Sequence, residues 1–266
     1  MPKLTVLVPC LNAEALLREC LESVAPVADE ILVVDSGSTD RTREIARAFT
    51  GRVLVHDYAN SAAQKNWAIP QAAHEWVLVI DTDERATSEL RRELRALLAG
   101  EPAEDGFRIL RQNYFFGTPI RHCGWERDDV LRLFRRDRGR YEEKRVHADV
   151  LVEGGRVGRL EGRLLHYTYT GFDQYLEKFG RYTTWAAEDL LDAGKRPTAW
   201  NLLARPAFRF FRMYVLRRGF LDGIPGLILC TLAAMSVFMK YAKLWAILRE
   251  KARSAPAGPP SGRGNA

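Results

Sequence analysis

Blocks of apolar and mixed residues alternate along the first part of the chain and predict strands and helices in turn. An uninterrupted apolar run at residues 76–80 predicts a strand buried on both faces, and further strands are predicted at residues 4–9, 30–35 and 52–58. Between these runs, apolar residues recur at helical spacing and predict helices at about residues 13–24, 40–49 and 62–73. Strands and helices that alternate with short connections predict an α/β fold, with a mostly parallel sheet and helices on both faces.

The strand at 76–80 organises this part of the chain because it ends in three carboxylates, Asp81, Asp83 and Glu84. In an extended segment, side chains two residues apart point the same way, so Asp81 and Asp83 converge. Converging carboxylates are costly unless a cation lies between them, and oxygen ligands suit Mg²⁺ or Mn²⁺. The alternative is that Asp83 or Glu84 only caps the helix that begins near Thr87.

Two other polar residues, Asn12 and Asp35, also follow predicted strands. Ligands of open α/β sheets bind beyond the carboxyl ends of the strands, where these side chains and the acidic cluster lie. The sequence has neither a Gly-x-Gly-x-x-Gly turn after the first strand nor a Gly-Lys-Ser/Thr loop. A nucleotide diphosphate would therefore be held by a metal ion and side chains rather than by a glycine-rich loop.

Charge separates the C-terminal part of the chain from the rest. The whole chain has a net charge of +6, whereas residues 200–253 hold ten basic and two acidic residues, a local net charge of +8. This segment also holds an apolar run at 227–239, shorter than the roughly 20 residues that span a bilayer. We expect it to lie in the membrane interface, and a buried helix or a dimer contact is the alternative. Nucleic acid is disfavoured, because a soluble nucleic-acid binder would not expose a long apolar run.

The remaining features define the expected organisation and compartment. The start of the chain has no basic region followed by a long apolar core, which argues against a signal peptide. The four cysteines are widely spaced and are expected to be reduced thiols of a cytosolic protein. A helix at 173–193 is expected to pack aromatic side chains on the preceding α/β domain. We predict two halves of a first domain at 1–110 and 111–199, a membrane-associating arm at 200–253 and a disordered tail at 254–266.

Three ordered motifs resemble the signatures of family 2 glycosyltransferases, enzymes with the GT-A fold that use nucleotide-diphosphate sugars. The motifs run from Val8 to Glu14, from Val33 to Thr42 and from Val79 to Glu84. Further motifs resemble one branch, the bacterial lipopolysaccharide core β-1,4-glucosyltransferase-like group. They are Gln112-Asn113-Tyr114, Gly124-Trp125, Arg132-Leu133-Phe134-Arg135-Arg136, Val146-His147 and His166-Tyr167-Thr168-Tyr169. The chain departs from this branch at Glu126-Arg127, where Tyr-Pro is usual, and at Ala148, where Glu is usual.

The resemblance implies that residues 1–110 form a nucleotide-sugar-binding half and residues 111–199 an acceptor-binding half. It also implies two sets of donor-site residues. The nucleotide-sugar set is Pro9, Asn12, Glu14, Asp35, Lys65 and Asp81, and the metal set is Asp83, Asp81 and His166. Asp35 would accept from the uracil ring or the ribose, although an aspartate in this turn also serves as an Asx-turn residue. Lys65 would meet the diphosphate unless it is a solvated surface lysine. His166 would complete the metal shell, unless it is a packed histidine.

Transfer with inversion needs a base near the acceptor hydroxyl, and the acids of residues 126–129 supply the candidates. The resemblance favours Asp128 as the catalytic base, with Asp129 second and Glu126 third. An acidic helix start is the alternative interpretation of these residues. Arg132, Arg135 and His147 are candidates for binding phosphates or an acidic acceptor, or else form a solvated basic strand edge.

The sequence thus predicts a metal-dependent inverting hexosyltransferase on the cytoplasmic face of a bacterial inner membrane. The resemblance implies a UDP-sugar donor such as UDP-glucose and a glycolipid acceptor such as a lipopolysaccharide core. A polyprenyl-phosphate sugar synthase shares the first half of the pattern and is the rival among enzymes. A non-catalytic membrane-binding module is the rival from another class.

Overall fold

The computed structural model describes residues 2–143, 149–169 and 171–254, and the chain divides into two compact units. The first comprises Met1–Arg121 and Trp125–Thr168, and the second comprises His122–Gly124 and Tyr169–Ala266. The functional divisions that we placed at residues 110 and 199 stay predictions. The predicted disordered tail lies outside the described residues from position 255 onward.

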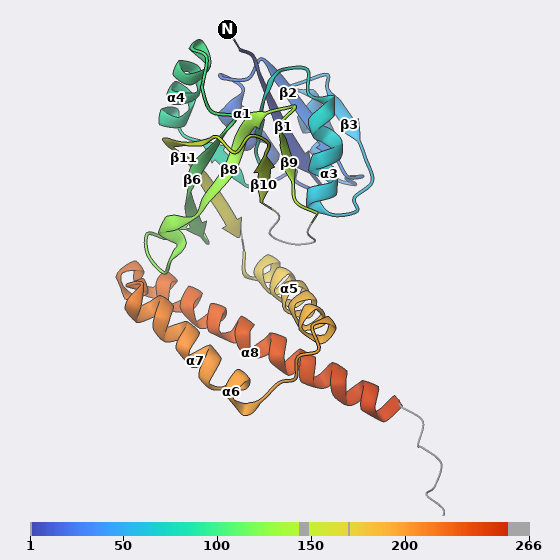
Figure 1. The fold of residues 1–266 in the computed structure, drawn as a ribbon, viewed down its shortest axis with the longest axis vertical. Helices are drawn as coiled ribbons and strands as arrows, with labels where there is room; N and C mark the ends of the chain where they lie inside the picture. The colour runs from blue at the N-terminus through green and yellow to red at the C-terminus, as the bar shows by residue number, and fades with distance from the viewer. Residues whose placement is uncertain (1, 144–148, 170, 255–266) are drawn as a thin grey trace, which may run out of the picture. The chain divides into compact units, whose positions relative to one another are not determined.

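A nine-stranded mixed sheet forms the centre of the first unit, with strand order β3-β2-β1-β4-β8-β6-β11-β5 and β7 paired to β6 (Figure 1). Its parallel half contains β1 (Leu4–Cys10), β2 (Glu30–Asp35), β3 (Val53–Val55) and β4 (Trp76–Val79). The helices that connect these strands are α1 (Leu17–Val24), α2 (Thr42–Arg47) and α3 (Ser61–Ala68), with a 3-10 turn, η1 (Ile69–Gln71), after α3. The predicted alternation of strands and helices is therefore confirmed.

The other half of the sheet is antiparallel where β4 meets β8 and where β8 meets β6, so the sheet is mixed rather than mostly parallel. Its strands are β5 (Glu84–Ala86), β6 (Gly106–Phe115), β7 (Thr118–Pro119), β8 (Asp129–Arg135) and β11 (Val157–Tyr169). The helix α4 (Ser88–Ala99), the 3-10 turn η2 (Trp125–Arg127) and a separate ribbon, β9 (Gly139–Tyr141) with β10 (Val150–Val152), complete the unit.

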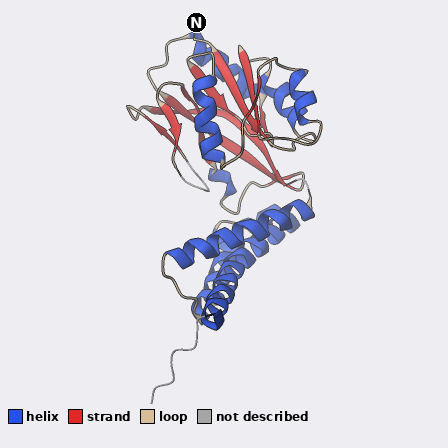
Figure 2. Ribbon diagram, turned by 90° about the vertical axis from the view of Figure 1, so that its right-hand side faces the viewer, coloured by secondary structure: helices blue, strands red, loops and turns tan. Residues whose placement is uncertain are grey.

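Two apolar layers cover the faces of this sheet, and Figure 2 shows helices on both sides of it. One face of β1 and β4 packs with α1, α2 and α4 through residues such as Leu21, Ile45 and Leu94. The opposite face packs with α3, η1 and the β9–β10 ribbon through residues such as Ala68 and Tyr141. Residues 76–80 are fully buried, as expected of a strand covered on both faces.

The second unit is helical and contains α5 (Phe172–Asp192), α6 (Ala199–Leu202), α7 (Ala204–Phe211) and α8 (Gly223–Ser254). A π-helical turn, η3 (Arg212–Leu216), and a 3-10 turn, η4 (Gly219–Asp222), join α7 to α8. Within this unit α5 packs on α8: Ala187 contacts the apolar cluster of Tyr241 and Leu244, and Lys243 Nζ donates to the Gly180 carbonyl at 2.6 Å. These α8 contacts come from Ala187 and Gly180 rather than from the aromatic residues of α5, whose packing on the first unit stays a prediction.

The helix α8 is longer than the apolar run that we counted in the sequence. By length and composition, the helical stretch Gly219–Arg253 is able to cross a membrane, and 22% of its most apolar window is buried within the structure. The run appeared too short because Lys240 and Lys243 interrupt the apolar pattern, whereas the helix continues through them. All four cysteines are free, as expected.

Candidate active site

Hydrogen bonds between its first and last acidic residues, Asp81 and Glu84, close the turn after β4. The Asp81 amide donates to Glu84 Oε2 at 3.0 Å, and the Glu84 amide donates to the Asp81 carbonyl at 2.9 Å. Thr87 caps α4, because its hydroxyl accepts from the Leu90 amide at 3.2 Å. The alternative that Asp83 or Glu84 merely caps this helix is therefore wrong.

Two cations of the protein compensate the carboxylates of Asp81 and Glu84 in this turn. Lys65 Nζ lies 2.8 Å from Asp81 Oδ1, and Arg132 Nη2 lies 2.5 Å from Asp81 Oδ2 and 2.7 Å from Glu84 Oε1. Lys65 is only 5% exposed and lies over the Tyr141 ring, and Glu84 is fully buried. The alternative of a solvated surface lysine is wrong, because α3 carries Lys65 directly onto the turn.

The charges in this cluster reinforce one another. Burial alone would raise the pKa of Asp81, but the positive charges of Arg132 and Lys65 hold that pKa well below its usual range. Burial would likewise lower the pKa of Lys65, but the Asp81 carboxylate raises it above its usual value. Both oxygens of Asp81 are therefore bound to protein cations, and its roles toward ribose and metal stay predictions.

A chain of hydrogen bonds runs from this cluster across β6 and β8 to β11. Arg111 lies 3.3 Å from Glu84 and holds Asp128 with two hydrogen bonds, from Nε at 2.9 Å and from Nη2 at 2.8 Å. Asn113 Nδ2 donates to Asp128 Oδ2 at 2.8 Å, and Asn113 Oδ1 lies 2.6 Å from His166 Nδ1. His166 Nε2 in turn lies 3.6 Å from Asp83 Oδ2. The chain thus brings together three predicted site residues, Asp83, Asp128 and His166.

The two leading base candidates lie in different surroundings. Asp128 immediately precedes β8, and Asp129 begins it, so the interpretation as an acidic helix start is wrong. Asp129 pairs with Arg108 at 3.7 Å and with Arg159 at 3.1 Å, apart from the chain that ends at His166. Burial would raise the pKa of Asp128, but its hydrogen bonds with Arg111 lower that pKa below the usual value. Asp128 is therefore ionised at neutral pH.

The chemistry of Asp83 and His166 fits a divalent cation. A carboxylate oxygen and an imidazole nitrogen face each other at 3.6 Å, too far apart for a hydrogen bond and close enough to bind one ion together. No set of three or more His, Cys, Asp or Glu side chains suited to a metal occurs among the described residues. Asp83 and His166 would hold such a cation, and Mg²⁺ is usually bound by one or two carboxylates together with substrate phosphates.

The loops after β1 and β2 are joined by hydrogen bonds between several predicted nucleotide-site residues. Asn12 accepts from the Thr39 amide at 2.9 Å, and Glu14 accepts from the Arg41 amide at 3.0 Å. Asp35 is fully buried and accepts from the amides of residues 37 and 38, both at 3.0 Å, so it forms the turn that we named as the alternative. Pro9 lies within β1. The nucleotide-binding roles of these residues stay predictions.

The sequence grouped Arg132 with Arg135, but the structure separates them. Arg132 lies in the acidic cluster, whereas Arg135 pairs with Glu75 and lies over the Trp76 ring at the opposite end of β8. Side chains that are three residues apart on a strand point to opposite faces of the sheet, which explains why Arg132 and Arg135 are separated. His147, the third candidate of this group, lies outside the described residues.

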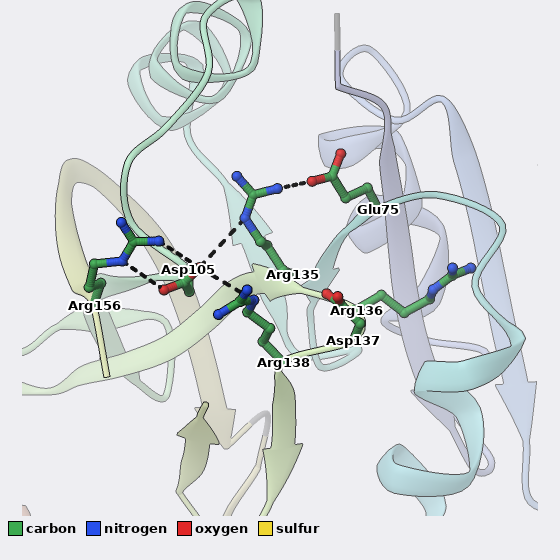
Figure 3. Close-up of a pocket in the computed structure, with 7 residues that line it drawn as sticks. All are labelled: Glu75, Asp105, Arg135, Arg136, Asp137, Arg138 and Arg156. Carbon is green, nitrogen blue, oxygen red and sulfur yellow. Dashed lines mark hydrogen bonds and ion pairs between the residues drawn. The ribbon is translucent and has the colours of Figure 1, made fainter. Parts of the chain in front are cut away.

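A pocket of about 440 Å³ surrounds Arg135 at the end of the sheet where β4 begins (Figure 3). It is lined by Glu75, Asp105, Arg135, Arg136, Asp137, Arg138 and Arg156. Arg156 holds the buried Asp105 at 3.1 Å, and Arg135 and Arg138 approach the same carboxylate to 3.7 Å. Ion pairs between the lining residues balance most of their charge, so we assign this pocket a structural role.

Sequence reasoning gave no role to Arg111 and Asn113. Arg111 and Asn113 are two residues apart on β6, so their side chains point to the same face of the sheet. This spacing of two polar residues was the signal in the sequence that could have linked them. The spacing alone could not reveal their role, because their partners Asp128 and His166 are distant in sequence and are brought close only by β8 and β11.

Comparison with known proteins decides the family. Residues 5–150 match the model of glycosyl transferase family 2. The chain belongs to this family. A lipopolysaccharide core biosynthesis glycosyltransferase, LpsC, of Rhizobium meliloti is 33% identical over 261 residues, which are 95% of this chain and 96% of the relative. An uncharacterized glycosyltransferase of Rickettsia typhi is 26% identical over 92% of this chain and 87% of that protein.

Among solved structures, the family 2 chain is similar to the glucosyl-3-phosphoglycerate synthase of Mycobacterium tuberculosis in complex with Mg²⁺ and uridine diphosphate. The identity is 24%, the TM-score is 0.35, and the match covers 42% of this chain and 44% of the other. At that score the likeness carries no argument about ligands. The family assignment rests on the sequence matches, and the mixed sheet with helices on both faces agrees with the predicted GT-A-like fold.

Proposed function

We propose that this family 2 glycosyltransferase moves a sugar, glucose in our proposal, from a UDP-sugar to a membrane glycolipid such as a lipopolysaccharide core. One observation carries the proposal. The chain Asp128–Asn113–His166–Asp83 joins a candidate base to candidate metal ligands at the carboxyl ends of β4 and β6. The name of the Rhizobium relative supports the acceptor class.

In this proposal, each residue of the cluster and of the hydrogen-bonded chain has a separate role. Asp83 and His166 hold Mg²⁺ or Mn²⁺, which when bound neutralises the negative charge on the departing diphosphate. Lys65 and Arg132 fix the turn that carries Asp83, since both bind its neighbour Asp81. Asp128 accepts the proton of the acceptor hydroxyl. Its lowered pKa makes it a weak base, and we expect its contribution near the lower end of general-base effects, about 10²-fold.

The donor nucleoside would lie over the joined loops after β1 and β2. Pro9, Asn12, Glu14 and Asp35 belong to this region in the proposal, with Asp35 shaping the turn. A screen of UDP-, GDP- and TDP-sugars with glycolipid and polyprenyl-phosphate acceptors tests the assignment. We expect transfer from a UDP-sugar to a glycolipid hydroxyl. Transfer to a lipid phosphate alone would support the rival synthase and contradict our acceptor class.

The helical unit supplies the proposed membrane contact. Its α6–α8 region exposes large apolar side chains, among them Leu203 at 71% and Ile224 at 73%. Arginines lie between them in sequence, and the region from residue 200 to 253 carries a net charge of +8. Apolar burial combined with attraction to anionic lipid is typical of interfacial segments. We propose peripheral attachment to the cytoplasmic face of the inner membrane.

Fractionation of bacterial membranes at high salt and high pH tests this attachment. Salt screens the attraction between basic side chains and anionic lipid, so an interfacial protein moves to the supernatant. Because α8 has the length to cross a membrane, a spanning helix is the alternative outcome. Retention of the full-length protein in the pellet until detergent is added would contradict peripheral attachment.

A further inference from the structure

The side chain of Asn113 lies between two groups that make different demands on its amide. Its Nδ2 is 2.8 Å from Asp128 Oδ2, and its Oδ1 is 2.6 Å from His166 Nδ1. The direction of this amide decides which nitrogen of His166 carries a proton. Chemistry fixes that direction, because one end of the chain cannot accept a hydrogen bond.

That end is Arg111, whose guanidinium only donates. It donates to both oxygens of Asp128, at 2.9 Å and 2.8 Å, so the carboxylate is an ionised acceptor. The NH₂ group of Asn113 must therefore face Asp128, and its carbonyl oxygen must face His166. Nδ1 of His166 then has to donate, since two acceptors at 2.6 Å would repel.

The proton on Nδ1 determines the state of the other ring nitrogen of His166, Nε2. A neutral histidine protonated at Nδ1 has a bare lone pair at Nε2, and that atom faces Asp83 Oδ2 at 3.6 Å. Two acceptors directed at one another are unfavourable without a cation between them. The Thr168 hydroxyl also lies near Nδ1, at 3.4 Å, and is farther away than Asn113.

We propose that Asn113 is a positioning residue that sets the Nδ1–H tautomer of His166, so that Nε2 is directed at the cation shared with Asp83. Arg111 and Asp128 act through it by fixing the direction of its amide. The inference rests on the proposed function for the metal itself. It goes further in assigning the state of His166 before any metal is bound, and this state is measurable in metal-free protein.

Long-range ¹H–¹⁵N NMR of the labelled, metal-free full chain in detergent reads the tautomer directly. The chain has five histidines, and His166→Gln identifies the signal of interest. At about pH 8, where an ordinary imidazole is neutral, we expect the Nδ1–H form in the wild type. In Asn113→Ala we expect a shift toward the Nε2–H form. An unchanged Nδ1–H signal in Asn113→Ala would overturn the inference.

Calorimetric titration of Mn²⁺ in the presence of UDP provides the second readout. Loss of a side chain that orients a metal-binding histidine typically weakens metal affinity by about 10- to 100-fold, and we expect this in Asn113→Ala. Gln112→Ala is the matched control, because its amide donates to the Ile120 carbonyl at 3.0 Å and the variant should bind as the wild type does. Equal Mn²⁺ affinity in Asn113→Ala and Gln112→Ala would contradict the proposal.

An exchange of the two side chains separates positioning from proton transfer. In Asn113→Asp/Asp128→Asn, the oxygen of the new Asn accepts from Arg111 Nη2, and its NH₂ group, in place of Oδ2, donates to the new Asp at the loss of the hydrogen bond from Arg111 Nε. The new Asp then accepts from His166 Nδ1. We expect this double variant to keep the tautomer and the Mn²⁺ affinity while losing transfer, because the carboxylate at position 128 is gone. Loss of the tautomer in a folded double variant would count against the chain of hydrogen bonds. If UDP binding to the wild type did not depend on Mn²⁺, the proposed function would fail. The NMR measurement on metal-free protein would still test whether Asn113 sets the tautomer of His166.

Discussion

The two ends of the sheet in the first unit both carry clusters of charged side chains, but the clusters are built differently. At the end where β4 begins, arginines meet carboxylates directly, as in Arg156 with Asp105 and Arg135 with Glu75. At the end where β4 finishes, cations hold Asp81 and Glu84, while Asp83 faces a ring nitrogen of His166. The first arrangement is complete as it stands, and the second is suited to an added cation. A dense set of ion pairs is therefore a poor guide to function by itself.

Removing one arginine from each cluster gives the largest contrast in stability. Arg132→Met removes the partner shared by the fully buried Glu84 and the partly buried Asp81, and we expect a loss of about 3–5 kcal/mol in the free energy of unfolding. Arg135→Met removes a partly exposed pair with Glu75, while the buried Asp105 keeps Arg138 and Arg156, so the loss should be about 1 kcal/mol or less. Urea unfolding of both variants checks the difference. Equal losses would break the comparison between the two ends.

A second contrast lies within adjacent residues. Asp128 belongs to the chain that reaches His166, whereas Asp129 pairs with Arg108 and Arg159. Single-turnover transfer by Asp128→Asn should be slower by about 10²-fold or more, and Asp129→Asn should stay near the wild-type rate. A normal rate in the first variant and an inactive second variant would assign the base to Asp129.

The smallest expected effect concerns Glu30, at the end of the sheet away from the site. Burial raises its pKa, but hydrogen bonds from the Thr5 hydroxyl and the Ala73 amide and the nearby Arg52 together lower it below the usual value. A lowered folded-state pKa adds stability above the unfolded value near 4, and this stability is lost as the pH falls through the folded value. Glu30→Gln should therefore be less stable than the wild type at pH 7, by about 1 kcal/mol or less.

Thermal unfolding of Glu30→Gln and the wild type between pH 7 and pH 3 measures this effect. The difference between them should shrink as the pH falls, since protonation removes the same charge from the wild type. A difference that stays constant with pH would show that the charge of Glu30 contributes nothing.

Much of the parallel half was predictable from sequence, because buried parallel strands leave uninterrupted apolar runs. The strand Glu30–Asp35 and the cluster after β4 follow from that rule. The antiparallel half was harder, since its strands mix polar and apolar residues and pair with distant partners. The burial of Lys65 could not be predicted from the sequence either, because only the fold brings Asp81 next to it. The separation of Arg132 from Arg135 did follow from strand periodicity, but their shared basic motif suggested a common role.

The central claim is that Asp83 and His166 hold a divalent cation for a nucleotide-sugar donor. Calorimetric titration of UDP with and without Mn²⁺ into the wild type, Asp83→Asn and Arg135→Met tests it most directly. We predict Mn²⁺-dependent UDP binding in the wild type and Arg135→Met, and loss of that dependence in a folded Asp83→Asn variant. Unchanged Mn²⁺-dependent binding of UDP by Asp83→Asn would contradict the assignment.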